Sequence, residues 1–237
     1  MRQQNELKET KISVIIPTLN EANNVGKLVQ HLLRHRNSLL AEVIVVDGGS
    51  LDNTVEVAQA AGAEVVVCKR CGRSHQMNVG SRKAKGTILY FVHCDTLPPV
   101  TYLTDILNAL KGGFSIGCFQ ATFDSNRPLV KLNGFFSRFD ALFCRGGDQT
   151  LFVTKLLFEQ LNGYKESLLI MEEYDFIIRA RKKHTFKIIP SKVLVSARKY
   201  EDRSYLKVQF ANLVVFNMFR FGVSQERLIQ TYRKLLG

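Results

Sequence analysis

Apolar residues follow two different periods in the first part of the chain. Val14, Ile15 and Ile16 form a short apolar run, which is typical of a strand buried inside a sheet. The next apolar residues recur at the helical period and predict one buried face of a helix: Val25, Leu28, Val29, Leu32 and Leu33. A second apolar run, 43–46, and a second helical segment, 53–61, repeat the order. Strand, polar loop and helix in succession predict a βαβ arrangement.

The rest of the chain keeps the same alternation. Further strands are predicted at 64–68, 87–92, 115–123, 150–153, 186–189 and 193–196. Further helices are predicted at 74–84, in the stretch that ends at 110, at 129–143, after 171, and twice at the C-terminal end, over 205–221 and 224–236. A chain of 237 residues without repeats or low-complexity tracts suits one domain. The predicted fold class is therefore α/β, with a mostly parallel central sheet flanked by helices.

Polar loops follow the first two predicted strands. They read Pro17-Thr18-Leu19-Asn20-Glu21 and Asp47-Gly48-Gly49-Ser50-Leu51-Asp52. In open α/β sheets, ligands bind beyond the carboxyl ends of the strands, and a helix N-terminus offers its N–H groups to anions. Each loop also carries a carboxylate suited to a ribose or a base. The loops therefore predict a nucleotide site, although Asp47 and Ser50 suit a turn and an N-cap equally well.

The chain is strongly basic, with a formal net charge of +12. Its basic residues cluster in three places: Lys69, Arg70, Arg73, Arg82, Lys83 and Lys85; then Arg179, Arg181, Lys182, Lys183 and His184; then Arg198 and Lys199. A phosphorylated substrate, an anionic membrane surface or nucleic acid would complement this charge, and a solvated basic face needs no partner. The sequence lacks the helix-turn-helix, zinc-finger and RNP-type motifs, so we expect no nucleic acid partner.

Nothing in the sequence indicates export or a membrane span. The segment 1–11 is polar and lacks the apolar core of a signal peptide, and no apolar run reaches the ~20 residues that cross a bilayer. The five cysteines are an odd number, which favours reduced thiols. Cys68 and Cys71 have the spacing of a metal or redox pair, but no second pair accompanies them. We therefore expect a cytoplasmic protein.

Several motifs, in this order, resemble family 2 glycosyltransferases, which have the GT-A fold. They are residues 16–21, residues 45–54, the Asp-terminated strand that ends at 95, and Glu172-Glu173. The segments 72–80, 93–98 and 147–149 are similar to the bacterial subgroup of rSAM/selenodomain-associated transferases. The resemblance extends from about Lys11 to Ser196. It implies one GT-A-like domain over 1–237, with a nucleotide-binding half (11–110), an acceptor and catalytic half (111–200) and C-terminal helices (201–237).

This resemblance implies a transferase that moves a sugar, with inversion, from a nucleotide-diphosphate sugar to an acceptor hydroxyl. Donor contacts are implied for Pro17, Thr18, Asn20, Glu21, Asp47, Gly49, Ser50, Arg73, Gln76 and Asn78. Arginine suits a diphosphate because its planar fork pairs two oxygens, although an arginine at this place could also be an ordinary surface residue. Many members have Asp-Asp-Gly-Ser where this chain has residues 47–50, which leaves uracil and guanine open as the donor base.

The resemblance also implies a divalent metal, Mn²⁺ or Mg²⁺, that stabilises negative charge on the leaving diphosphate. The family's Asp-x-Asp metal motif is replaced here by His93-x-Asp95. Asp95 is the implied metal ligand, unless it only caps a helix. His93 is either a second metal ligand or a structural residue, because imidazole can bind Mn²⁺ but suits Mg²⁺ poorly.

Catalysis by direct displacement requires a base that accepts the proton of the acceptor. Glu172 and Glu173 stand where the family has Glu-Asp, which makes Glu173 the implied catalytic base, one methylene longer than usual. The alternative is that these residues only complement the N-terminal dipole of a helix. Asp148 and Gln149 are implied to contact the acceptor.

The segment 205–221 is rich in Phe, Val and Leu and has Lys207 and Arg220 near its ends. It could lie on a membrane as a peripheral contact, next to a lipid-linked acceptor at the inner face of the membrane. A buried core helix or a homodimer interface would also explain it. Two other functions stay open: a nucleotidyltransferase, and a non-catalytic module that binds a nucleotide sugar or RNA.

Overall fold

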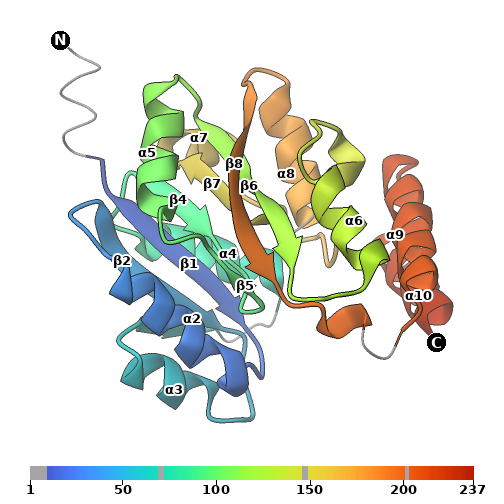
Figure 1. Ribbon diagram of the computed structural model, residues 1–237, viewed down its shortest axis with the longest axis horizontal. Helices are drawn as coiled ribbons and strands as arrows, with labels where there is room; N and C mark the ends of the chain where they lie inside the picture. The colour runs from blue at the N-terminus through green and yellow to red at the C-terminus, as the bar shows by residue number, and fades with distance from the viewer. Residues whose placement is uncertain (1–9, 69–71, 146–148, 201–202) are drawn as a thin grey trace.

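A twisted eight-stranded sheet forms the centre of the described structure (Figure 1). The structure is a computed structural model that describes residues 10–68, 72–145, 149–200 and 203–237. The strands lie in the order β3-β2-β1-β4-β7-β6-β8-β5. Their bounds are β1 (Ile12–Thr18), β2 (Leu40–Asp47), β3 (Glu64–Val67), β4 (Ile88–Phe91), β5 (Thr96–Leu97), β6 (Ile116–Phe123), β7 (Leu151–Thr154) and β8 (Phe186–Val195). Lys69, Arg70, Cys71 and the segment 1–9 lie outside the described residues.

Most of these strands run in the same direction. β1 pairs in parallel with β2 and β4, β2 with β3, and β6 with β8. β7 is antiparallel to both of its neighbours, and the two-residue β5 is antiparallel to β8. The carboxyl ends of β1, β2, β4 and β6 therefore share one edge of the sheet, where the predicted site residues follow.

Helices cover both faces of the sheet (Figure 1). They are α2 (Ala22–Arg34), α3 (Thr54–Ala60), α4 (Arg73–Lys83), α5 (Tyr102–Lys111), α6 (Pro128–Phe136), α7 (Lys155–Gln160), α8 (Glu172–Arg181), α9 (Tyr205–Arg220) and α10 (Gln225–Leu236). Side chains on alternate sides of β1 show the two layers. Ile12, Val14 and Ile16 belong to the core with α2 and α5, whereas Ile15 belongs to the core with α4, α7 and α8.

The predicted helix over 129–143 is wrong in its second half. α6 ends at Phe136, and after a turn the chain makes a short 3-10 helix, η1 (Leu142–Cys144). Ser137 ends α6, because its Oγ donates to the carbonyl of Gly134 (2.6 Å) and accepts from the backbone N–H of Ala121 on β6 (3.0 Å). The buried Arg145 then donates to the carbonyls of Ser137 and Phe139, which removes them from any helical ladder.

The strands predicted at 186–189 and 193–196 are a single strand, β8. Pro190 suggests a break, because proline cannot donate to a sheet ladder. In the structure Phe119 pairs with Ile189 and Gln120 pairs with Lys192, so two residues of β8 bulge out and the pairing resumes. The sequence also missed β5 and α7, which are too short to show a period.

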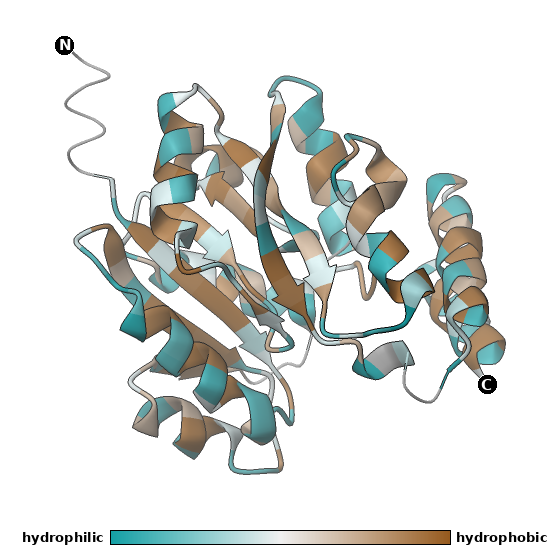
Figure 2. Ribbon diagram, viewed as in Figure 1, coloured by the Kyte–Doolittle hydropathy of each residue, from teal (hydrophilic) through white to brown (hydrophobic). Residues whose placement is uncertain are grey.

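The helices α9 and α10 pack together at the far end of the molecule from α2 and α3 (Figure 1). α9 buries Val208, Ala211 and Val215 and exposes more than half of Phe210 and Leu213. Figure 2 accordingly shows hydrophobic and hydrophilic residues mixed along this pair. Within the described residues no helix is long and apolar enough to cross a membrane.

Candidate functional site

Asp47 organises the loop after β2. Its side chain is buried, and Oδ2 accepts from the backbone N–H groups of Gly49 (2.9 Å) and Ser50 (2.8 Å). Oδ1 accepts from the hydroxyl groups of Ser50 and Thr18. Gly49 has a φ of 91°, which glycine adopts without strain. Of the two sequence interpretations of Asp47, turn chemistry is therefore visible in the structure, and contact with a base or ribose stays a prediction.

The loop after β1 is tied directly to the loop after β2. Asn20, at a φ of 55°, donates its backbone N–H to the hydroxyl of Ser50 (2.8 Å) and accepts from the N–H of Leu51 (2.8 Å). The carboxylate of Glu21 accepts a hydrogen bond from the side-chain amide of Asn24 and forms an ion pair with Arg198 (3.4 Å). Pro17 and Thr18 are the last residues of β1. The loops after β1 and β2 are thus linked to each other by hydrogen bonds.

Gln76 lies beneath these two loops rather than on their surface. It is buried on α4, and its amide Nε2 donates to the carbonyls of Thr18 and Val46, each at 2.7 Å. Gly48 lies directly against this amide, where a Cβ would come within 3.1 Å of it. The sequence implies a donor contact for Gln76, whereas in this structure the side chain joins the ends of β1 and β2.

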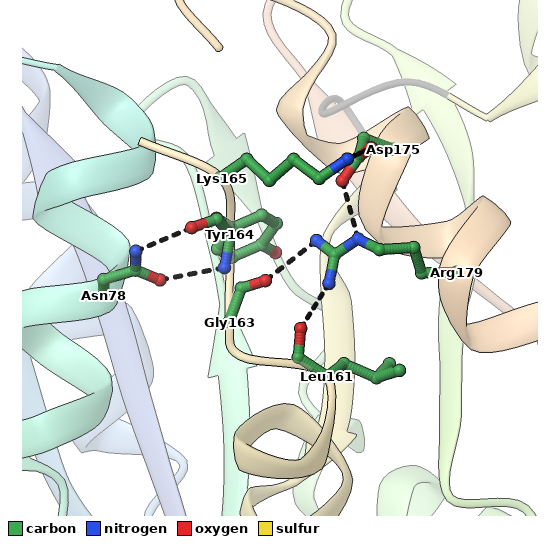
Figure 3. Close-up of polar contacts among 7 residues, drawn as sticks. All are labelled: Asn78, Leu161, Gly163, Tyr164, Lys165, Asp175 and Arg179. Carbon is green, nitrogen blue, oxygen red and sulfur yellow. Dashed lines mark hydrogen bonds and ion pairs between the residues drawn. The ribbon is translucent and has the colours of Figure 1, made fainter. Parts of the chain in front are cut away.

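Asn78 has a similar inward role (Figure 3). Its side chain is buried, and it accepts from the backbone N–H of Tyr164 (3.0 Å) and donates to the carbonyl of the same residue (2.8 Å). From α8, Arg179 donates to the carbonyls of Leu161 and Gly163 and pairs with Asp175. The segment 161–165 is therefore held between α4 and α8, and Asn78 does not face the surface of the donor loops.

An acidic pair opens α8. Glu172 and Glu173 are both buried, and Met171 before them adopts a φ of 67°, which is strained for a residue with a side chain. Burial raises the pKa of Glu172, and the guanidinium of Arg73 opposes this rise. Arg73 Nη1 lies 3.5 Å from Glu172 Oε1, which links the start of α4 to the start of α8. The structure thus brings together three residues that the sequence assigned to donor binding and catalysis.

His93 connects the acidic pair to the end of β4. Its Nε2 lies 2.9 Å from Glu173 Oε1, and both side chains are largely buried. Only Nδ1 of His93 is therefore left for a metal. Asp95 is half-buried, and the contact described for its carboxylate is a 3.3 Å hydrogen bond from the Thr96 hydroxyl. That carboxylate is open to further ligation.

The possible metal ligands in this site suit a metal ion that binds together with the substrate. Among the described residues no group of three or more His, Cys, Asp and Glu side chains could hold a metal ion. Cations such as Mg²⁺ are commonly held by one or two carboxylates together with substrate phosphates and water. Asp95 alone fits such a site once a diphosphate supplies further oxygens.

A cavity of about 590 Å³ adjoins the acidic pair. Arg73, Glu172 and Glu173 line it, together with aromatic residues from α6, η1, α9 and α10 that the sequence did not identify as site residues, such as Phe136, Phe143, Tyr205 and Tyr232. The sequence signal for this wall is limited to Phe136 and Phe143, in the stretch 129–143 whose pattern predicts a helix.

Gln149 lines the same cavity, as expected for a residue near an acceptor. Its amide is already engaged, because Nε2 donates to the carbonyl of Cys144 (2.7 Å) and Oε1 accepts from Arg145 (2.6 Å). Gln149 therefore shapes the wall. Asp148, the other residue assigned to the acceptor, lies outside the described residues.

Comparisons with known proteins bear on the family and on the fold. The model of the family "Glycosyl transferase family 2" matches residues 13–166. A dolichol-phosphate mannosyltransferase of Pyrococcus furiosus is 32% identical to this chain. The matched part covers 45% of this chain and 32% of the mannosyltransferase. A glucosyl-3-phosphoglycerate synthase of Petrotoga mobilis is 40% identical over 53% of this chain and 42% of its own length. The chain thus spans less than half the length of these curated relatives.

Solved structures with the same fold include enzymes with bound nucleotides. The glucosyl-3-phosphoglycerate synthase of Mycobacterium tuberculosis, in complex with Mn²⁺, UDP and glucosyl-3-phosphoglycerate, has a TM-score of 0.65 at 16% identity, over 93% of this chain and 83% of that one. S. aureus TarS 1-349 in complex with UDP-GlcNAc has a TM-score of 0.67 at 16% identity, over 95% of this chain and 71% of that one. The fold is therefore the GT-A fold.

Proposed function

The chain belongs to glycosyltransferase family 2, and from this premise we propose that it moves a sugar, with inversion, from a nucleotide-diphosphate sugar to an acceptor hydroxyl. The observation that carries the proposal is the buried pair Glu172 and Glu173, which adjoins both Arg73 and a cavity of about 590 Å³. A carboxylate beside a cavity can accept the proton of an acceptor hydroxyl bound there.

Each group then has a separate role. Glu173 accepts the proton of the acceptor hydroxyl. His93 holds the Glu173 carboxylate in position through the 2.9 Å contact. Arg73 binds the diphosphate, and the tied loops after β1 and β2 hold the nucleoside. We propose uridine as the base, since the Mycobacterium tuberculosis and S. aureus structures hold UDP and UDP-GlcNAc. Asp95 would hold a divalent cation, which would supply positive charge for the leaving diphosphate.

Three finer assignments belong to the same proposal. The motifs at 72–80, 93–98 and 147–149 support membership of the rSAM/selenodomain-associated subgroup. The basic character of the chain supports a cytoplasmic enzyme that works at the inner face of a membrane. The chain is divided into a nucleotide half (11–110) and an acceptor half (111–200). The donor loops lie in the first half and Glu172 lies in the second, which supports this division.

The direct test is a thermal-shift screen of UDP, GDP and CDP, each with and without Mn²⁺. A ligand at about 100 times its dissociation constant adds about 2.7 kcal/mol of stability, or roughly 5–11 °C for a domain of this size. We expect a Mn²⁺-dependent shift with UDP that Asp95→Asn abolishes and that Asp105→Asn, on α5, retains. A folded protein that none of the three nucleotides shifts would contradict the proposal.

The alternative is a non-catalytic module that binds a nucleotide sugar. The His93–Glu173 contact favours this alternative, because the candidate base and the histidine of the metal motif bind each other. Such a module would show the UDP-dependent shift but would release no UDP from a UDP-sugar. An RNA-binding module would instead show binding to RNA that falls steeply with salt.

A further inference from the structure

The cavity beside Glu172 and Glu173 combines an aromatic wall with polar and charged groups. Phe136 and Phe143 line it on one side, and Tyr200, Tyr205 and Tyr232 line it from the C-terminal region. Phe136 is 43% exposed and Phe143 is 66% exposed, so the aromatic wall continues from the cavity to the protein surface. Aromatic rings offer large apolar areas with little loss of conformational freedom on binding. A volume of about 590 Å³ lies within the usual range of small-molecule sites.

The charged groups on the described wall of this cavity are Arg73, Glu172 and Glu173. Arg73 Nη1 lies 3.5 Å from Glu172 Oε1, so the cation is already close to a carboxylate. A phosphate or carboxylate group on the acceptor would meet two acidic side chains here. Once Arg73 binds the donor diphosphate, an anionic acceptor would face these two carboxylates with no other cation on the described wall, which is unfavourable.

The polar groups of the wall are mostly satisfied by one another. Asn133 donates to the hydroxyl of Tyr200 (2.8 Å) and accepts from the hydroxyl of Tyr205 (3.0 Å), and Gln209 also donates to Tyr200 (3.2 Å). These contacts hold the hydroxyl groups of Tyr200 and Tyr205, two residues that line the cavity. Asn212 also lines the cavity, is half-buried, and has no hydrogen bond to another described side chain. Its amide can donate to or accept from a hydroxyl group of a ligand.

We propose that the acceptor is a neutral amphiphilic alcohol, with a hydroxyl-bearing head at Glu173 and an apolar body along the aromatic wall. This inference rests on the proposed function. In the transfer, the hydroxyl gives its proton to the Glu173 carboxylate and its oxygen bonds to the anomeric carbon of the donor. The bond from that carbon to the diphosphate breaks, and the diphosphate leaves with the electron pair.

The test measures binding by calorimetry and needs no turnover. The probes are octyl β-glucoside below its micelle concentration, methyl β-glucoside, and 3-phosphoglycerate as the anionic comparison. We expect octyl glucoside to bind at least about tenfold tighter than methyl glucoside, because alkyl carbons are buried on the wall, and 3-phosphoglycerate not to bind. Asn212→Arg places a cation in the cavity and should weaken octyl glucoside binding about tenfold or more. The matched control, Leu213→Arg, adds the same charge at a neighbouring residue that is 57% exposed and does not line the cavity.

Several outcomes would overturn the inference. They are 3-phosphoglycerate binding as tightly as octyl glucoside, no binding of either glucoside to folded protein, or equal weakening by Asn212→Arg and Leu213→Arg, which would indicate adsorption to the surface. Failure of the proposed function is seen separately. In that case octyl glucoside still binds in the cavity, but UDP with Mn²⁺ produces no thermal shift.

Discussion

Gln76 offers a sharp test of whether a site residue contacts the donor or supports the donor loops. Gln76→Met keeps the length of the side chain but removes both amide N–H groups. The carbonyls of Thr18 and Val46, at the ends of β1 and β2, then lose their 2.7 Å hydrogen bonds inside the protein. We expect the free energy of unfolding to fall because these buried acceptors lose partners that water cannot replace.

The size of the loss follows from the remaining contacts. Leaving a buried polar group unsatisfied costs about 1–3 kcal/mol. The carbonyl of Thr18 still accepts from the backbone N–H of Gly48 (2.9 Å), and that of Val46 keeps a long contact with the Thr18 hydroxyl (3.5 Å). The lower end of the range therefore applies to each, or about 2 kcal/mol in total. For a domain of this size this lowers the melting temperature by roughly 4–8 °C.

The assay is urea unfolding of the full chain, followed by circular dichroism, with UDP affinity measured in parallel. Gln59→Met on the exposed side of α3 is the matched control and should change stability by less than about 0.5 kcal/mol. Unchanged stability of Gln76→Met, combined with weaker UDP binding, would refute the supporting role and restore Gln76 as a donor contact.

Three further substitutions test the acidic pair and the segment it borders. Glu173→Gln should lower kcat by about 10²–10⁴-fold, because general base catalysis contributes that much; equal UDP affinity checks that the donor site is intact, and wild-type kcat would exclude Glu173 as the base. Burial raises the pKa of Glu172 above its usual 4.5, so the folded protein binds the carboxyl proton more tightly than the unfolded chain does. Ionisation of Glu172 therefore opposes folding as the pH rises. Glu172→Gln should therefore raise the melting temperature at pH 7, and the gain should shrink towards pH 4; a gain that does not depend on pH would contradict this cause. Arg179→Lys removes the fork that reaches the carbonyls of Leu161 and Gly163 and should cost about 2 kcal/mol in urea unfolding, whereas an unchanged midpoint would show that this fork adds no stability.

The sequence predicts the α/β alternation well because burial imposes a period. β1 is buried along its whole length, and α2 buries Val25, Leu28, Val29 and Leu32, as their spacing requires. The prediction over 129–143 fails because the phenylalanines there do not face the core. Phe135, Phe139 and Phe143 are each 45–66% exposed, so their apolar character does not mark the buried face of a helix.

Residue type alone predicts the neighbourhood of the site better than the role of each side chain. Glu172, Glu173 and Arg73 lie together, as their motifs imply. Gln76 and Asn78 come from the same motif as Arg73, but they point inward, because α4 turns these positions towards β1 and the segment 161–165. Which face of a helix a polar side chain occupies depends on what packs against it, and a motif does not record this.

The contact between His93 and Glu173 has a consequence for how this chain can change over generations. Both residues stand where the sequence resemblance implies aspartates, and their side chains meet at a distance of 2.9 Å. Replacing His93 alone by aspartate would set two carboxylates against each other, and shortening Glu173 alone would open a gap beside the imidazole. Either single step loses this contact, so histidine at 93 and glutamate at 173 should be inherited together.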